Sequence, residues 1–284
     1  MARLRPTTVV ATVVAVLVLA GGGALLLSGF GDAGAEPRAE LSPCLTLAGA
    51  RRDACFDEVF ARQAARGNVA PTVAALERLV RDGRLDDCHL LAHSLAHAAV
   101  AAMGVDRAFL LADDGCRMGY VHGAAERADP RAEARAAPPG AVAGERCSRF
   151  VKRDLAASCS HGYGHALLRA SPGDLQASAD GCRAAERYGI HVIPCEAGVM
   201  MQHSLDRSRL GETGLLAGAR EGCARLAAAR LRTRCHRNVG VVAAFALSHD
   251  AARAEALCRR LPARKGRSDC LAGARKEVEE ARAG

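Results

Sequence analysis

The chain has 284 residues, half of them apolar. Beyond an N-terminal segment, about 240 residues remain, which suffice for one large domain or one continuous repeat array. Aromatic residues make up only 3% and Trp is absent, so a core must use Ala, Leu and Val, which favours closely packed helices over sheets. The net charge of +8 is dispersed Arg without a basic block. Because base-stacking aromatics and recognisable motifs are also missing, we expect no nucleic-acid binding.

The N-terminus predicts export from the cytoplasm. Arg3 and Arg5 precede an uncharged, mostly apolar run from Thr8 to Phe30. That run of 23 residues exceeds the roughly 7–15 residues of a signal-peptide core and is long enough for the roughly 20 of a membrane-spanning helix. We expect residues 1–35 to form a signal anchor, or a signal peptide that is cleaved at about residue 35. Either outcome places a linker at 36–43 and an ectodomain at 44–284 outside the cytoplasm, membrane-anchored or secreted.

The twelve cysteines predict disulfide bonds in an oxidising compartment. No CxxC motif occurs, which argues against zinc ribbons, thioredoxin-type sites and c-type haem attachment. Each staple of this loop size adds about 3 kcal/mol in the chain-entropy model. Ten of the cysteines recur in pairs with ten to twelve residues between them, for which we predict the bridges Cys44–Cys55, Cys147–Cys159, Cys182–Cys195, Cys223–Cys235 and Cys258–Cys270.

The paired cysteines also predict the fold. Ala- and Leu-rich stretches flank each pair, so each unit reads as a helical hairpin whose disulfide ties the end of one helix to the start of the next. We therefore expect an all-α, solenoid-like array of stapled hairpins, similar in general architecture to tetratricopeptide or Sel1-like repeats. Residues 128–144 contain Pro138-Pro139 and are expected to form an exposed loop.

Cys88 and Cys116 remain outside these five pairs. Each stands at the start of a segment that carries histidine. We expect them to bridge adjacent repeats, and the alternative is a pair of free thiols that could bind metal beside the histidines.

Histidines gather in the middle of the chain at helical spacing. Three i,i+4 pairs occur where composition alone would give about 0.3, and such pairs offer two imidazoles on one helix face. His122 and His165 each lie six residues after a cysteine, so stacking would bring them together. The predicted metal ligands are His89, His93, His97, His122, His161 and His165. Further residues that could line this site are Gln202, His203, Tyr120 and Tyr163.

Several glycines interrupt these otherwise helical segments, and each costs up to about 1 kcal/mol relative to Ala. They predict either close approach of neighbouring helices or room for another group. They are Gly119, Gly123, Gly162, Gly164 and Gly198.

The runs CHLLAH, GYVHG, CSHGYGHALL and CEAGVMMQ resemble the signature of an uncharacterised bacterial family of membrane-anchored or secreted helical proteins. That signature reads CHxxxH, HG, CxHGxGH and CxxGxFME and covers about residues 85–205 here. The resemblance implies a shared site but no known activity. Gln202 stands where an acidic residue is usual. The positions that the resemblance carries over are His89, His93, His122, His161 and His165.

Two functional hypotheses follow. A carboxylate-poor histidine site suits Zn, Cu or Fe, with haem less favoured because aromatic residues are few. The HExxH, ExxH and GxSxG motifs are absent, so we expect no metalloprotease of that type, di-iron bundle or serine hydrolase, and whether any reaction is catalysed stays open. If it is catalysed, Tyr120 or Tyr163 would donate hydrogen bonds. The competing hypothesis is an interaction module of the cell envelope for an acidic partner, in which the histidines are core residues or sense pH. A core role is expected for His191, His236 and His249.

Overall fold

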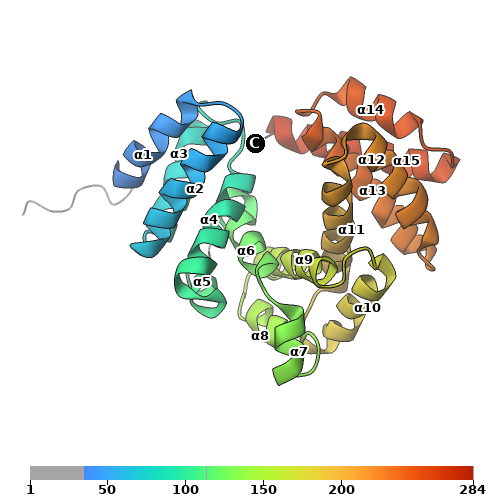
Figure 1. The fold of residues 1–284 in the computed structure, drawn as a ribbon, viewed down its shortest axis with the longest axis horizontal. Helices are drawn as coiled ribbons and strands as arrows, with labels where there is room; N and C mark the ends of the chain where they lie inside the picture. Colours follow the sequence, from blue (N-terminus) through green and yellow to red (C-terminus); the bar gives the residue numbers. More distant parts are fainter. Residues whose placement is uncertain (1–34, 113, 284) are drawn as a thin grey trace, which may run out of the picture. The chain divides into compact units, whose positions relative to one another are not determined.

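The helices that carry the second cysteine of each pair stack on one another along the chain, and the helix that follows Cys88 belongs to the same stack. The computed structural model describes residues 35–112 and 114–283, and within them no β-strand occurs. Each stacked helix packs on the next, as the blue-to-red order in Figure 1 lets the reader follow. The stacked helices are α2 (Ala50–Ala65), α4 (His89–Met103), α6 (Gly115–Glu126), α9 (Arg153–Ala170), α11 (Val192–Ser208), α13 (Ala229–Ala246) and α15 (Arg264–Ala283).

Shorter helices connect the members of this stack. Several begin with an aspartate whose side chain accepts backbone N–H groups of the first turn, as Asp174 does from Ala177 and Asp250 from Arg253. The connecting elements are α1 (Ala35–Leu41), η1 (Ser42–Thr46), α3 (Val69–Arg81), α5 (Val105–Leu110), α7 (Pro130–Ala136), α8 (Ala141–Ser148), α10 (Leu175–Ala185), η2 (Glu186–Tyr188), α12 (Gly211–Ala217), η3 (Gly218–Cys223) and α14 (Ala251–Arg259). The all-α repeat architecture predicted from the sequence is confirmed.

All six predicted disulfides are present, and no free cysteine occurs in the part of the chain that the structure describes. Five of them tie a connecting element to the stacked helix that follows. The sixth, Cys88–Cys116, joins two consecutive stacked helices, α4 and α6, so free thiols beside the histidines are excluded. Six bridges indicate an oxidising, extracytoplasmic environment. The disulfides are Cys44–Cys55, Cys88–Cys116, Cys147–Cys159, Cys182–Cys195, Cys223–Cys235 and Cys258–Cys270.

Two segments differ from their predictions. The segment expected as a linker at 36–43 is largely helical, because residues 35–41 form α1, which packs on α3. The expected loop at 128–144 contains α7 and the start of α8, although Pro138 and Pro139 do separate the two helices. A short Pro-initiated helix with an aspartate cap, Asp129, is compatible with exposure, and α7 has no buried residue.

The predicted N-terminal anchor at residues 1–35 lies almost wholly outside the described residues. Within residues 35–112 and 114–283, no helix combines the length and the apolar character needed to cross a bilayer.

Glycines set the distance between the stacked helices. A Cβ atom built on Gly162 of α9 would lie 2.3 Å from the carbonyl oxygen of His122 in α6. The same comparison gives 1.9 Å between Gly198 of α11 and the carbonyl oxygen of His161 in α9. Real Cβ atoms do not approach backbone this closely, so only glycine permits these contacts. Of the two explanations offered by the sequence, close approach of helices is the one that the structure supports.

A close contact between a glycine and a backbone carbonyl also occurs between α13 and α15, where it can be tested. In Gly273→Ala, the new Cβ would lie 2.0 Å from the carbonyl oxygen of Arg237, so α15 must move away from α13. We expect the free energy of unfolding to fall by about 1–3 kcal/mol in urea titrations followed by circular dichroism, despite the better helix propensity of Ala. The control is Gly181→Ala, whose new Cβ would meet only flexible Leu167 methyl groups at 3.3 and 3.4 Å and should not destabilise. A Gly273→Ala protein as stable as wild type would contradict the role assigned to this glycine.

Candidate metal centre

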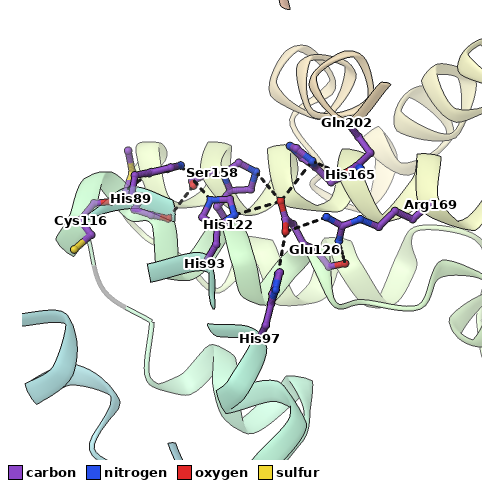
Figure 2. Close-up of polar contacts among 11 residues, drawn as sticks. His89, His93, His97, Cys116, His122, Glu126, Ser158, His165, Arg169 and Gln202 are labelled. Atoms are coloured by element: carbon purple, nitrogen blue, oxygen red, sulfur yellow. Dashed lines mark hydrogen bonds and ion pairs between the residues drawn. The ribbon is translucent and has the colours of Figure 1, made fainter. Parts of the chain in front are cut away.

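Three stacked helices bring their histidines to one buried cluster around the carboxylate of Glu126. His89, His93 and His97 lie on α4, His122 and Glu126 on α6, and His161 and His165 on α9. Neighbouring rings from different helices are close, with centroids 4.2 Å apart for His93 and His122 and 4.4 Å apart for His122 and His161. Figure 2 shows the side chains of α4, α6 and α9 converging on Glu126.

Glu126 was not among the residues singled out from the sequence, and it is the centre of the cluster. Its side chain is only 5% exposed. Its Oε2 atom accepts hydrogen bonds from His97 Nε2 at 2.9 Å and from Arg169 Nη2 at 3.2 Å. Its Oε1 atom faces His93 Nδ1 at 3.4 Å and His165 Nδ1 at 3.4 Å. The expectation of a carboxylate-poor site is therefore wrong. The available signal was the i,i+4 spacing of His122 and Glu126, which places both on one helix face.

The Nδ1 atoms of the cluster are held by oxygen acceptors. His165 Nδ1 donates to Gln202 Oε1 at 2.9 Å, and the Gln202 amide is oriented because its Nε2 donates to Asp206 at 2.8 Å. His89 Nδ1 donates to the carbonyl oxygen of Cys116 at 3.2 Å. A neutral imidazole has one N–H, so these bonds leave the lone pair of each ring on Nε2. This arrangement is usual for metal-binding histidines, whose other nitrogen donates to an oxygen atom of the outer shell.

Within the cluster, the Nε2 atoms of His122, His161 and His165 are buried without a hydrogen-bond partner. His122 Nε2 lies 3.6 Å from Glu126 Oε1, beyond hydrogen-bond distance. A buried polar atom left unpaired costs about 1–3 kcal/mol. Ligand atoms of these three residues all lie within 4.8 Å of one another. The same holds for a second group, His89, His93 and His122, which shares one residue with the first. Each group could hold a metal ion.

A left-handed turn positions the α4 end of the cluster. Cys116, Arg117 and Met118 have φ angles of 49°, 52° and 62°, which are rare for residues other than glycine and cost about 1–3 kcal/mol each. The disulfide to Cys88 holds the turn covalently. Hydrogen bonds hold it too: the Cys116 carbonyl accepts from His89, its N–H donates to Glu77 Oε1 at 3.1 Å, and Ser158 Oγ donates to the carbonyl of Met118 at 3.3 Å. The turn therefore places an acceptor against His89 in α4 while α6 begins.

Other sequence-predicted residues lie elsewhere. His97 contacts Glu126 but belongs to neither three-histidine group, and its side chain is 30% exposed. His203 packs against η3, with Nε2 at 3.2 Å from the carbonyl of Gly218. Tyr120 donates to the carbonyl of Ala108, and Tyr163 borders a small cavity with Phe109 and Cys147. The prediction that these tyrosines would donate hydrogen bonds at the site is wrong, because two residues along a helix turn a side chain by about 200°.

The histidines predicted to have structural roles lie outside the cluster. His236 Nδ1 donates to the carbonyl of Arg232 at 2.8 Å, and His249 Nε2 lies 3.7 Å from Glu277. The backbone N–H of His191 donates to Ser160 Oγ at 3.0 Å.

A cavity of about 450 Å³ opens beside the cluster. Glu126 and Arg169 form its inner wall, and apolar side chains such as Val100 and Ala166 line it further. Arg127 and Arg131 lie at the same cavity. A small solute, in particular an anion, can therefore reach the Glu126 edge of the cluster.

Burial keeps the imidazoles neutral. It lowers the pKa of His122 and of His161 well below the usual value, and neighbouring imidazoles add to the effect. Burial also lowers the pKa of His165. In His89, burial and the nearby ring of His93 lower the pKa to about 4. Neutral imidazole is the form that binds metal ions.

Glu126 behaves in the opposite way. Burial alone would raise the pKa of its carboxyl group, but the imidazole of His165 and the hydrogen bonds from His93 and His97 hold that pKa well below its usual range. The site thus combines four imidazoles whose neutral form is favoured, those of His89, His122, His161 and His165, with a buried carboxyl group whose ionised form is favoured.

Comparisons of this chain with protein-family models, with curated proteins and with solved structures found no match. The interpretation of the site therefore depends on its geometry.

The lowered histidine pKa values predict the pH dependence of stability without metal. Between pH 7 and 5 the unfolded chain takes up protons on histidines near pH 6.5, whereas burial opposes protonation of His89, His122, His161 and His165 in the fold, so the free energy of unfolding should decrease as pH falls. Each such histidine contributes up to about 1.4 kcal/mol per pH unit. Glu126 does not affect this window, because its contribution is lost only as pH falls below the usual carboxyl pKa. Urea titrations in EDTA at several pH values measure the slope, which His161→Asn should reduce by about one proton. A free energy that stays constant from pH 7 to 5 would refute the expectation.

Proposed function

We propose that this protein is an extracytoplasmic helical-repeat protein that binds a transition metal ion at the Glu126-centred histidine cluster. The observation that carries the proposal is the set of three buried, unpartnered Nε2 atoms on His122, His161 and His165. Buried unpaired polar atoms are costly, and the ligand atoms of these three histidines, unlike the other such atoms, lie within 4.8 Å of one another. A bound cation accepts all three lone pairs at once.

The donor set narrows the choice of metal. Imidazole nitrogens suit Zn, Cu and Fe, and three of them around one ion leave a fourth position open, as catalytic zinc sites do. Haem is disfavoured, because rings whose centroids lie 4.2–5.0 Å apart leave no space for a porphyrin between them.

The surroundings of the cluster support the proposal. Gln202 and the carbonyl of Cys116 fix the tautomers of His165 and His89. The cavity beside Glu126 brings solvent to the edge of the cluster at that carboxylate. The residues shared with the bacterial family signature named above are the ones that meet in the cluster, and membership of that family is part of the proposal.

The proposed location is the cell envelope. The six disulfides support an oxidising compartment, and the apolar run from Thr8 to Phe30, outside the described residues, supports membrane attachment.

The proposal is tested by elemental analysis of the full chain, purified in detergent without a histidine tag. We expect Zn, Cu or Fe in the wild-type protein and none in the double variant His93→Ala/His165→Ala, which removes one ligand from each three-histidine group. The matched control is His191→Ala/His236→Ala, which removes two histidines outside the cluster and should retain the metal. A folded wild-type protein that takes up none of the three metals would instead support the alternative, an interaction module without metal.

Gln202 provides a second test. Replacing it with Leu removes the acceptor of His165 Nδ1–H, and losses of this kind weaken metal binding about 10–100-fold. Gln202→Glu keeps an oxygen acceptor for His165 but loses the donor to Asp206, so its loss of affinity should be smaller than that of Gln202→Leu. Competition titrations with a chromophoric chelator measure both affinities. Equal affinities for Leu and Gln at this position would show that the contact does not orient the imidazole.

A further inference from the structure

The cluster offers more ligands than one ion uses. Five imidazoles form the two overlapping groups, His122/His161/His165 and His89/His93/His122, and a structural or catalytic zinc site rarely takes more than four protein ligands. The first group has its three unpartnered Nε2 atoms. Whether the second group needs a bound cation depends on which nitrogens of His89 and His93 carry their N–H protons.

His89 and His93 face each other through their Nε2 atoms, which lie 3.1 Å apart. The N–H of His89 is on Nδ1, because that atom donates to the carbonyl oxygen of Cys116. In His93, Nδ1 faces the carboxylate oxygen Oε1 of Glu126 at 3.4 Å, which likewise favours a proton on Nδ1. If both rings are neutral, each has only one N–H, so two lone pairs point toward one another.

Two facing lone pairs at this distance repel unless a cation lies between them. Two nitrogens bound at 2.0–2.1 Å to one tetrahedral ion lie about 3.3 Å apart, close to the observed separation. A proton shared between the two Nε2 atoms is the other way to satisfy the pair.

We propose that the centre binds two metal ions, one on His122, His161 and His165 and a second between His89 and His93. This inference rests on the proposed function of the cluster as a metal site. His122 lies between the two sets, since its ring centroid is 4.2 Å from that of His93 and 4.4 Å from that of His161. The two ions are therefore near neighbours on either side of one imidazole.

Glu126 serves both ions from the outer shell. Its Oε1 atom faces Nδ1 of His93, from one set, and Nδ1 of His165, from the other. A single carboxylate thus orients one ligand of each ion and supplies negative charge to both. Arg169 and His97 hold its second oxygen, so the carboxylate is not free to rotate.

The number of ions per chain tests this proposal. The full chain, stripped with EDTA, is loaded with excess Zn²⁺, desalted and analysed for metal and protein. We expect two ions in the wild type, one in His89→Ala, one in His161→Ala and two in the control His236→Ala, with circular dichroism confirming that each variant is folded. One ion in the wild type, whichever variant removes it, overturns the two-ion proposal and leaves the metal-binding function standing. No ion in the wild type means that the proposed function itself fails.

Loading with Cu²⁺ tests the separation of the ions and needs no variant. Two Cu²⁺ ions on either side of His122 should interact, so the electron paramagnetic resonance signal at two equivalents should be broadened or should integrate to fewer spins than the copper present. In His89→Ala the signal should return to that of an isolated ion and integrate to one spin per copper. A wild-type signal that accounts for all the copper as isolated ions would overturn the arrangement.

Discussion

The contact between a glycine Cα and a backbone carbonyl of the neighbouring helix is the constraint on which the site depends. Gly119 and Gly123 of α6 meet the backbone at His89 and His93 of α4, and Gly162 of α9 meets the carbonyl of His122. At each contact the histidine backbone is the surface that the next helix touches. The main chain of the histidines is itself the packing surface between the helices. This packing brings the imidazoles of three helices into contact.

The disulfides complement this packing and explain why a core poor in large side chains is sufficient. Five bridges fix a connecting element to its stacked helix, whereas Cys88–Cys116 fixes two stacked helices to each other beside His89. That bridge also holds the left-handed turn that begins at Cys116. The positive φ angles of the turn cost conformational free energy, and such a turn persists only where surrounding contacts fix it in place. The disulfide network is thus most directly coupled to the site at the left-handed turn of Cys116, Arg117 and Met118.

Much of this organisation could be predicted, and what could not has a physical reason. Cysteine spacing predicts the bridges because loop length restricts which pairs can close, and i,i+4 spacing predicts the histidine face because helix geometry is local. Glu126 was missed because its role depends on histidines from three helices and on Arg169, which are distant in sequence. The helix at 35–41 was missed because its partner, α3, lies some thirty residues later.

In this cluster, one residue supplies the negative charge, Glu126, and another, Gln202, supplies the hydrogen-bond acceptor for His165. Gln202 accepts a hydrogen bond from His165 through its amide oxygen, and its amide nitrogen donates to Asp206. Glu126 already provides a negative charge at the site. It is buried from solvent and contacts imidazoles of all three helices. A second buried carboxylate beside the first would be repelled by it unless additional positive charge were bound. An amide at 202 therefore keeps the tautomer of His165 fixed without adding to the charge that the centre must accommodate.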